Sequence, residues 1–213
     1  MIEVFDCEQG SPEWFACRAG IPTASMFATV MAKGEGKTRG KYMRELAGEI
    51  LTGEPAEGYS NGHMDRGKAM EDEARSTYAF IHDAEIRRVG FIRCGNKGAS
   101  PDSLVGENGG LEIKTALPHI QIDRLERDRL PPEHKAQVQG NLWVSKREWW
   151  DFVSYWPKLP MLKVRVWRDE PYIKEMAEEV DHFNEELSAL VERIRHFGAD
   201  EELPDAARFL MAG

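Results

Sequence analysis

The hydrophobic pattern over the middle of the chain predicts a β-hairpin. A short strand is expected over residues 100–105 and a second strand over 111–115. Between them, the Asn-Gly-Gly triplet at 108–110 is a turn signal. The chain folds back here, so the hairpin brings its two strands side by side.

The two faces of this hairpin differ in chemistry. Successive side chains of a strand point to opposite faces, so Leu111 and Ile113 share one face and Glu112 and Lys114 share the other. The apolar pair belongs in a core. The charged pair lies across the hairpin from Asp102, an arrangement that packing alone does not require.

Apolar positions at spacings of three and four predict helices on both sides of the hairpin. Ser11 is expected to cap the first helix, with Pro12 at its first position. Later helices are expected to begin at Thr23 or Ser25, in the basic segment that follows, at Asn61, at Ile120, at Pro131 and at Pro171. Further strands are expected over 85–94, 149–156 and 162–167.

The last helix carries one continuous apolar stripe and an acidic back, which is typical of a packing helix. The stripe consists of Ile173, Met176, Val180, Phe183, Leu187, Leu190, Ile194 and Phe197.

With 213 residues, of which 41% are hydrophobic, the chain can form one well-buried domain. No apolar run reaches the roughly 18–20 residues that span a bilayer, and the first residues do not resemble a signal peptide. The three cysteines, Cys7, Cys17 and Cys94, match neither a disulfide framework nor a zinc site. We therefore expect a cytoplasmic protein without a membrane partner.

The net charge of −9 lies entirely in the C-terminal part of the chain. Residues 169–213 contain 13 acidic and 4 basic residues, whereas the first 168 contain 24 of each. A neutral body can still present a basic groove to an anionic partner. The acidic segment is expected to be a solvated outer face, away from any nucleic acid.

Residues 33–44 hold five basic residues, one acidic residue and three glycines. They are interpreted as a flexible basic loop that enters a helix. The segment is either a solvated linker or a loop that contacts a phosphate backbone. Its glycine spacing does not match a P-loop.

The charged face of the hairpin predicts a metal site. Two converging carboxylates, Asp102 and Glu112, repel each other unless a cation lies between them. Oxygen ligands suit Mg²⁺ or Mn²⁺, and the Ile113 carbonyl is a candidate third ligand. Lys114 beside the metal would have a lowered pKa and would position or deprotonate a water. The alternative is an exposed hairpin with a surface ion pair.

Two further polar residues lie on faces that should meet the protein interior. Glu71 shares a helical stripe with apolar residues, so it needs a partner, which is either a metal or metal-bound water, or Arg75. Gln139 shares its helix face with Leu142 and Trp143. It either supports a site or hydrogen-bonds the backbone.

Pro101-Asp102 followed by Glu112-x-Lys114 resembles the PD-(D/E)XK nuclease superfamily. The details resemble one branch, the phage lambda exonuclease or YqaJ-like viral recombinase family, from about Trp14 to Val153. The matching pieces are Trp14-x-x-x-Arg18, Thr23-Ala-Ser25, Gly67-Lys-x-x-Glu71-x-x-Ala-Arg75, Ser100-Pro-Asp102, Leu111-Glu-Ile-Lys114 and Ala136-Gln-Val-Gln139-x-x-Leu-Trp143.

This resemblance implies an α/β fold with a restriction-endonuclease-like core, a central mixed sheet flanked by helices in a single domain. The core would span about 11–168, followed by an acidic helix and tail over 169–213. The implied activity is a Mg²⁺-dependent 5′-to-3′ exonuclease on double-stranded DNA ends, which leaves 3′ single strands for phage recombination. The alternatives are an endonuclease or Holliday-junction resolvase with the same core, and a DNA-binding protein with an idle site.

The resemblance also implies roles for individual residues. Asp102, Glu112 and the Ile113 carbonyl would bind two Mg²⁺ or Mn²⁺ ions per site. Lys114 would activate the water, Glu71 would assist through a metal-bound water, and Gln139 or else Gln137 would support the site. The 5′-phosphate would be held by Arg18, Ser25 and Ser100, with Gln137 among the candidate substrate contacts. Implied partners are duplex DNA ends, two further copies in a toroidal homotrimer, and a single-strand annealing protein in the bacterial host.

Overall fold

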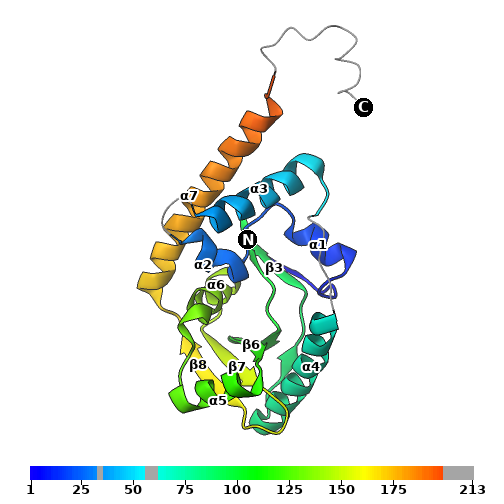
Figure 1. The fold of residues 1–213 in the computed structure, drawn as a ribbon, viewed down its shortest axis with the longest axis vertical. Helices are drawn as coiled ribbons and strands as arrows, with labels where there is room; N and C mark the ends of the chain where they lie inside the picture. Colours follow the sequence, from blue (N-terminus) through cyan, green and yellow to red (C-terminus); the bar gives the residue numbers. More distant parts are fainter. Residues whose placement is uncertain (33–35, 56–61, 199–213) are drawn as a thin grey trace.

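The structure is a computed structural model that describes residues 1–32, 36–55 and 62–198 (Figure 1). Within these residues, a five-stranded sheet has the order β2-β5-β6-β7-β8. Its strands are β2 (Ile86–Arg87), β5 (Ser103–Val105), β6 (Gly109–Thr115), β7 (Trp149–Tyr155) and β8 (Leu162–Trp167). The pair β6 and β7 is parallel and the other neighbours are antiparallel, so the sheet is mixed, as expected.

The predicted hairpin is formed by β5 and β6, but its turn lies earlier than expected. Residues 106–108 make the turn, and Gly109 and Gly110 belong to β6. The reason is the neighbouring strand. A Cβ on Gly110 would lie 2.2 Å from the ring of Trp150, and one on Gly109 would lie 2.1 Å from the ring of Trp149. The two glycines therefore admit the tryptophan rings of β7.

A second sheet contains β1 (Ile2–Phe5), β3 (Phe91–Cys94) and β4 (Lys97–Ala99) in the order β1-β3-β4. The single strand predicted over 85–94 was wrong, because β2 and β3 belong to different sheets. The chain leaves one sheet and enters the other at Gly90. A Cβ there would lie 2.3 Å from the carbonyl oxygen of Cys7, so only glycine fits this crossing.

The helices agree with the predicted pattern in order and approximate position. They are α1 (Pro12–Arg18), η1 (Ala24–Met26), α2 (Phe27–Val30), α3 (Lys37–Thr52), α4 (Gly62–His82), α5 (Pro118–Arg127), η2 (Pro132–His134), α6 (Lys135–Ser145) and α7 (Glu170–Arg195). Ser11 caps α1, with its hydroxyl accepting from the Trp14 backbone N–H. Gly53, in the left-handed region, closes α3. Asn61, the predicted start of the fourth helix, lies outside the described residues.

The basic segment 33–44 is mostly helical, not a loop. Helix α3 begins at Lys37, and residues 33–35 lie outside the described part of the chain. Arg39 of this helix binds Glu186 of α7 at 2.7 Å and so joins the two helices. The prediction of a flexible loop was therefore wrong for 37–44.

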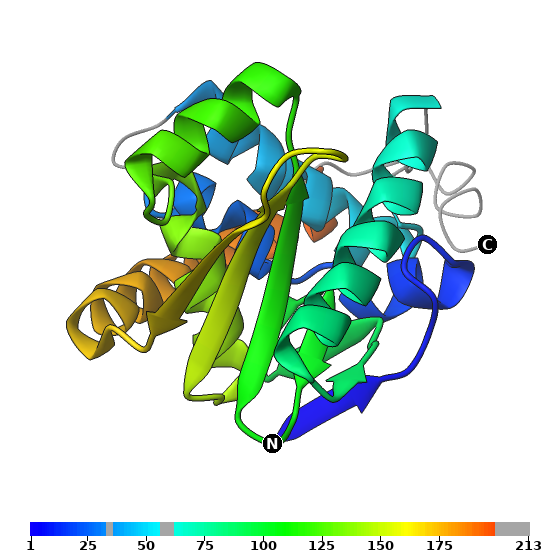
Figure 2. The same ribbon diagram turned by 90° about the horizontal axis from the view of Figure 1, so that it is seen from below.

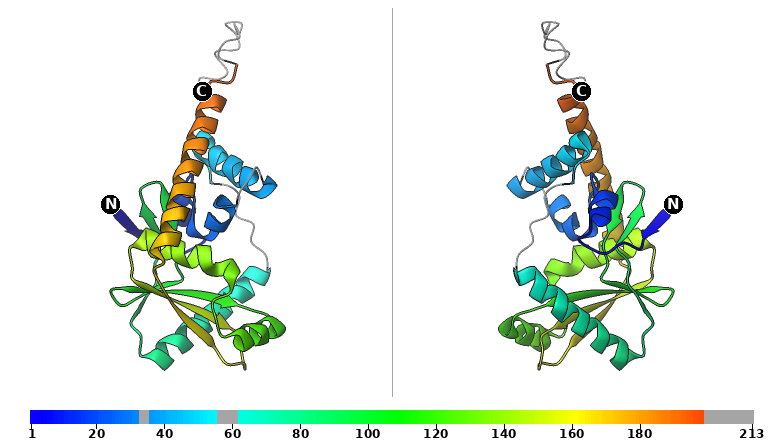
Figure 3. Two further views of the ribbon diagram at one scale, coloured as in Figure 1. Left: turned by 90° about the vertical axis from the view of Figure 1, so that its left-hand side faces the viewer. Right: turned by 90° about the vertical axis from the view of Figure 1, so that its right-hand side faces the viewer.

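The large sheet lies between α4 on one face and α6 on the other (Figure 2, Figure 3). On one face, Ala74 and Tyr78 of α4 pack against Leu111 and Ile113. On the other face, α6 packs against β7 in a larger core that also holds α3 and α7. The sheet face opposite α4 is the one that carries Glu112 and Lys114.

The apolar stripe of α7 is buried along most of its length, from Ile173 to Val191. Beyond that point Ile194 is 46% and Phe197 86% exposed, so the end of the predicted stripe is not covered by the described residues. Figure 1 shows this end of α7 extending past α3. None of the helices in the described part of the chain is long and apolar enough to span a membrane.

Candidate active site

The predicted hairpin residues meet where β6 extends beyond the end of its shorter partner β5. Strand β5 pairs only with residues 109–111, so none of the described strands lies beside the next part of β6 on that side. The side chain of Asp102 takes its place, and its Oδ2 accepts from the backbone N–H of Ile113 at 2.5 Å. In a strand, the N–H and C=O of one residue point to the same edge. The Ile113 carbonyl therefore faces the same side as Asp102.

Glu112 is held on both of its oxygens. The Nε2 of Gln137 donates to Oε1 at 2.6 Å, and the Nδ2 of Asn141 donates to Oε2 at 3.0 Å. The Lys114 ammonium binds Oε1 at 2.7 Å. Glu112 is only 1% exposed, so these contacts supply the hydrogen bonds that a buried carboxylate needs. The carboxylate is thereby set in one orientation.

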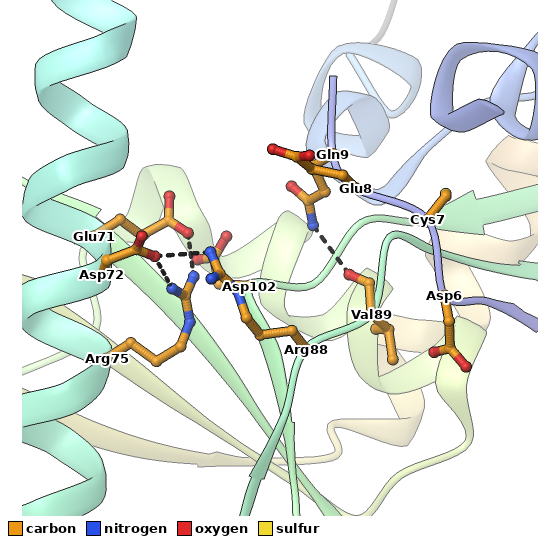
Figure 4. A pocket seen from close by; sticks show the side chains of 10 residues that line it. All are labelled: Asp6, Cys7, Glu8, Gln9, Glu71, Asp72, Arg75, Arg88, Val89 and Asp102. Atoms are coloured by element: carbon orange, nitrogen blue, oxygen red, sulfur yellow. Dashed lines mark hydrogen bonds and ion pairs between the residues drawn. The ribbon is translucent and has the colours of Figure 1, made fainter. Parts of the chain in front are cut away.

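Glu71 approaches the site from α4, on the other side of the sheet. It lines a cavity of about 460 Å³ together with Asp102, and its carboxylate is bound by Arg75 (Figure 4). Arg75 is buried and also donates to the hydroxyl of Ser103 at 3.0 Å. The ion-pair alternative is thus what forms, and Arg75 holds Glu71 beside Asp102.

The acidic residues act on one another. Burial raises the pKa of Asp102 well above its usual range, and the nearby carboxylates of Glu112 and Glu71 raise that pKa further. Burial alone would lower the pKa of Lys114, but Glu112 and Asp102 outweigh it and raise this pKa instead. The side chains around Lys114 thus raise its pKa, whereas the lowered pKa expected of Lys114 beside a bound metal stays a prediction.

This donor set fits a hard divalent cation. In the described residues no group of three His, Cys, Asp or Glu side chains is placed to hold an ion. The candidate ligands are instead two carboxylates, Asp102 and Glu112, with the Ile113 carbonyl. A cation between them would relieve the repulsion that raises the pKa of Asp102. Glu71, bound to Arg75, lines the same cavity as Asp102.

The three residues expected at the 5′-phosphate lie on segments that pack together. The indole of Trp14 donates to Ser100 Oγ at 3.0 Å, and the Arg18 guanidinium lies 4.0 Å from the centre of the same ring. Ser25 lies two residues after Thr23, and the hydroxyls of the two residues are 3.3 Å apart. Thr23 forms an isolated bridge with Gly98, two residues before Ser100. Burial lowers the pKa of Arg18.

Gln139 does not lie at this site. Its Nε2 donates to the Trp167 carbonyl at 2.9 Å, and its Oε1 accepts from the Asp169 N–H at 3.0 Å. The backbone alternative is therefore the one observed. Gln137, the second choice, contacts Glu112 instead. Asn141 was missed, although its position four residues after Gln137 on one helix face was a usable signal.

The sequence from residue 13 to residue 148 matches the model of the YqaJ-like viral recombinase domain. The chain belongs to this family. Its matched region holds the hairpin and the α6 residues that contact Glu112. No curated protein sequence matches the chain.

Two crystal structures of family relatives are closely similar. The structure of LHK-Exo in complex with dAMP is 37% identical, covers 89% of this chain and 98% of its own, and gives a TM-score of 0.82. The alkaline exonuclease LHK-Exo from Laribacter hongkongensis is 36% identical over the same shares, with a TM-score of 0.81. The expected PD-(D/E)XK fold is thereby confirmed, and a nuclease role in recombination is supported.

A phage related exonuclease from Haemophilus somnus 129PT has the same fold at 16% identity. It covers 82% of this chain and 96% of its own, with a TM-score of 0.62.

Proposed function

We propose that this protein is a Mg²⁺-dependent exonuclease that digests one strand of duplex DNA from its 5′ end. The observation that carries the proposal is the meeting of Asp102, Glu112 and Lys114 at the open edge of β6, with both Glu112 oxygens held in place. The dAMP in the LHK-Exo crystal structure adds support, because a nucleoside monophosphate is what an exonuclease releases.

In this proposal Asp102, Glu112 and the Ile113 carbonyl hold the divalent cation, Mg²⁺ or Mn²⁺, with two ions per site. When bound, the cation supplies Lewis-acid activation of the phosphodiester. Lys114, which binds Glu112 at 2.7 Å, would position or activate the attacking water. Glu71 would assist through a metal-bound water.

Arg18, Ser25 and Ser100 hold the terminal 5′-phosphate in this proposal. The packing of Arg18 on Trp14, and of Trp14 against Ser100, gives the guanidinium a defined position. A charge-assisted contact to a terminal phosphate fixes the end of the strand relative to the catalytic residues. Each cut would then expose a new 5′-phosphate, which gives the reaction its direction.

We further propose that the protein acts in the cytoplasm of a bacterial host as a ring-shaped homotrimer, and that the 3′ single strand passes to an annealing protein. A duplex threaded through a closed ring does not leave by simple dissociation, which would make digestion processive.

The test uses linear duplex DNA with a label at the 5′ or the 3′ end of each strand, incubated with the pure protein and Mg²⁺. Release of the 5′ label first is the expected result. Glu112→Gln and Lys114→Ala should each lower the rate by several orders of magnitude while DNA binding persists. Closed circular duplex should survive, and cutting of circles at a comparable rate would establish an endonuclease instead. Equal digestion by wild type and both variants would show that this site is idle.

A further inference from the structure

A polar network that the proposed mechanism does not use lies one strand away from Lys114. In the parallel ladder of β6 and β7, Lys114 is the register partner of Ser154, so their side chains share a sheet face. The hydroxyl of Ser154 accepts from Arg124 Nη1 at 3.0 Å. Arg124 Nη2 lies 3.1 Å from Nε2 of His134, whose ring stacks on Phe152 at 5.0 Å.

Arg124 is a largely buried cation with weak charge compensation. Its side chain is 12% exposed, and within the described residues its nearest carboxylate is Glu133, 3.9 Å away and 63% exposed. Arg165, on strand β8 next to β7, is by contrast fully paired with a carboxylate. It binds the fully buried Asp151 through two hydrogen bonds of 2.8 and 2.9 Å. A buried charge without a close partner is costly, so the position of Arg124 calls for an anionic partner.

The two groups that hydrogen-bond to Arg124, the Ser154 hydroxyl and the His134 ring, are neutral and firmly held. Gln121 is fully buried, and its amide binds the Ser154 hydroxyl at 2.6 Å and the Ser154 carbonyl at 3.0 Å. Burial, together with Lys114 and Arg124, lowers the pKa of His134 to about 4. The ring is therefore neutral at pH 7 and presents the lone pair of Nε2 to Arg124. These contacts orient the guanidinium without neutralising it.

We propose that Arg124 binds a backbone phosphate of the DNA strand next to the phosphate that is cleaved. The proposal rests on the proposed nuclease function and adds a substrate contact on the far side of Lys114 from the acidic cluster. A guanidinium is suited to this task because its planar fork matches phosphate oxygens. The DNA phosphate would supply a closer anion than Glu133, the nearest carboxylate among the described residues.

The first test compares Arg124→Gln with Arg127→Gln in duplex-end binding without divalent cation, over a series of salt concentrations. Arg127 lies on the same helix but is 58% exposed and paired with Asp123, so it is a matched control. Arg124→Gln should weaken binding about tenfold and reduce the slope of log affinity against log salt by about 0.9, the value for one lost phosphate contact. Arg127→Gln should leave both close to wild type.

A second measurement replaces single phosphates near the cut by neutral methylphosphonates. One position next to the cut should weaken binding to the wild type but not weaken binding to Arg124→Gln further. If Arg124→Gln does not fold, Arg124→Lys takes its place. The methylphosphonate at that position should then weaken binding to Arg124→Lys less than it weakens binding to the wild type. If each methylphosphonate weakens binding to the wild type and to the variant by the same factor, the role of Arg124 is overturned. Digestion by the wild type is measured in parallel. An inactive wild type would contradict the nuclease proposal itself, separately from the role of Arg124.

Discussion

The hydrogen bonds from α6 to the Glu112 carboxylate lead to a quantitative prediction. Asn141→Ala removes the donor to Oε2 of a carboxylate that is 1% exposed, and Asn141 is itself 1% exposed. A hydrogen bond to a charged group contributes about 1.5–3 kcal/mol. We expect the free energy of unfolding to fall by about 2 kcal/mol. With a urea dependence of about 2 kcal/mol per molar, the unfolding midpoint should drop by about 1 M.

The same substitution should weaken metal binding. Residues that orient a metal ligand typically change affinity about 10–100-fold when removed. Isothermal titration of Mn²⁺ into the pure protein measures this directly, without reference to activity. The Mg²⁺ concentration for half-maximal digestion should rise by a similar factor.

Gln139→Ala is the matched control for Asn141→Ala. Gln139 is 2% exposed on the same helix and also loses hydrogen bonds, but its partners are the backbone at Trp167 and Asp169. It should destabilise the protein by a comparable amount and leave Mn²⁺ affinity unchanged. Equal loss of Mn²⁺ affinity in both variants, or no loss in Asn141→Ala, would refute the reasoning.

Three further predictions concern other parts of the molecule. Asp102→Asn should abolish digestion but stabilise the metal-free protein at pH 7. The folded pKa of Asp102 is raised, so stability without divalent cation should fall as pH rises above about 4, and urea unfolding of the variant should show a weaker fall. Arg18→Ala should lower the ratio of digestion rates on 5′-phosphorylated and 5′-hydroxyl duplexes; an unchanged ratio would remove Arg18 from the phosphate site. Asp151→Asn removes the buried charge that pairs with Arg165 and one of the two oxygens that accept from Tyr78 and Arg165. It should cost about 3 kcal/mol in urea unfolding, and no loss would contradict the importance of this cluster.

The alternation of β6 was readable from the sequence because it is a local property. Any strand over 111–115 must put Leu111 and Ile113 on one face and Glu112 and Lys114 on the other. The turn was misplaced for the opposite reason. Gly109 and Gly110 resemble a turn locally, but the tryptophan rings of β7, about 40 residues later in the chain, require them as strand residues.

The choice between the two glutamines depended on helix docking. Gln137 and Gln139 are two residues apart, about 200° around a helix, so only one of them can face β6. The local pattern could not say which, since that depends on how α6 packs on the sheet. In the fold Gln137 and Asn141 face Glu112, and Gln139 binds the chain before α7.

The amino-acid sequence alone was sufficient for most of the helices, the charged hairpin face and the family, because spacing and residue type carry that information. Tertiary structure decided which groups touch: Arg75 on Glu71, Asn141 on Glu112, and Arg124 beside Ser154. The first of these pairs is four residues apart, but the other two join segments about 30 residues apart. Such contacts depend on how helices pack against the sheet, and no short-range pattern encodes that packing.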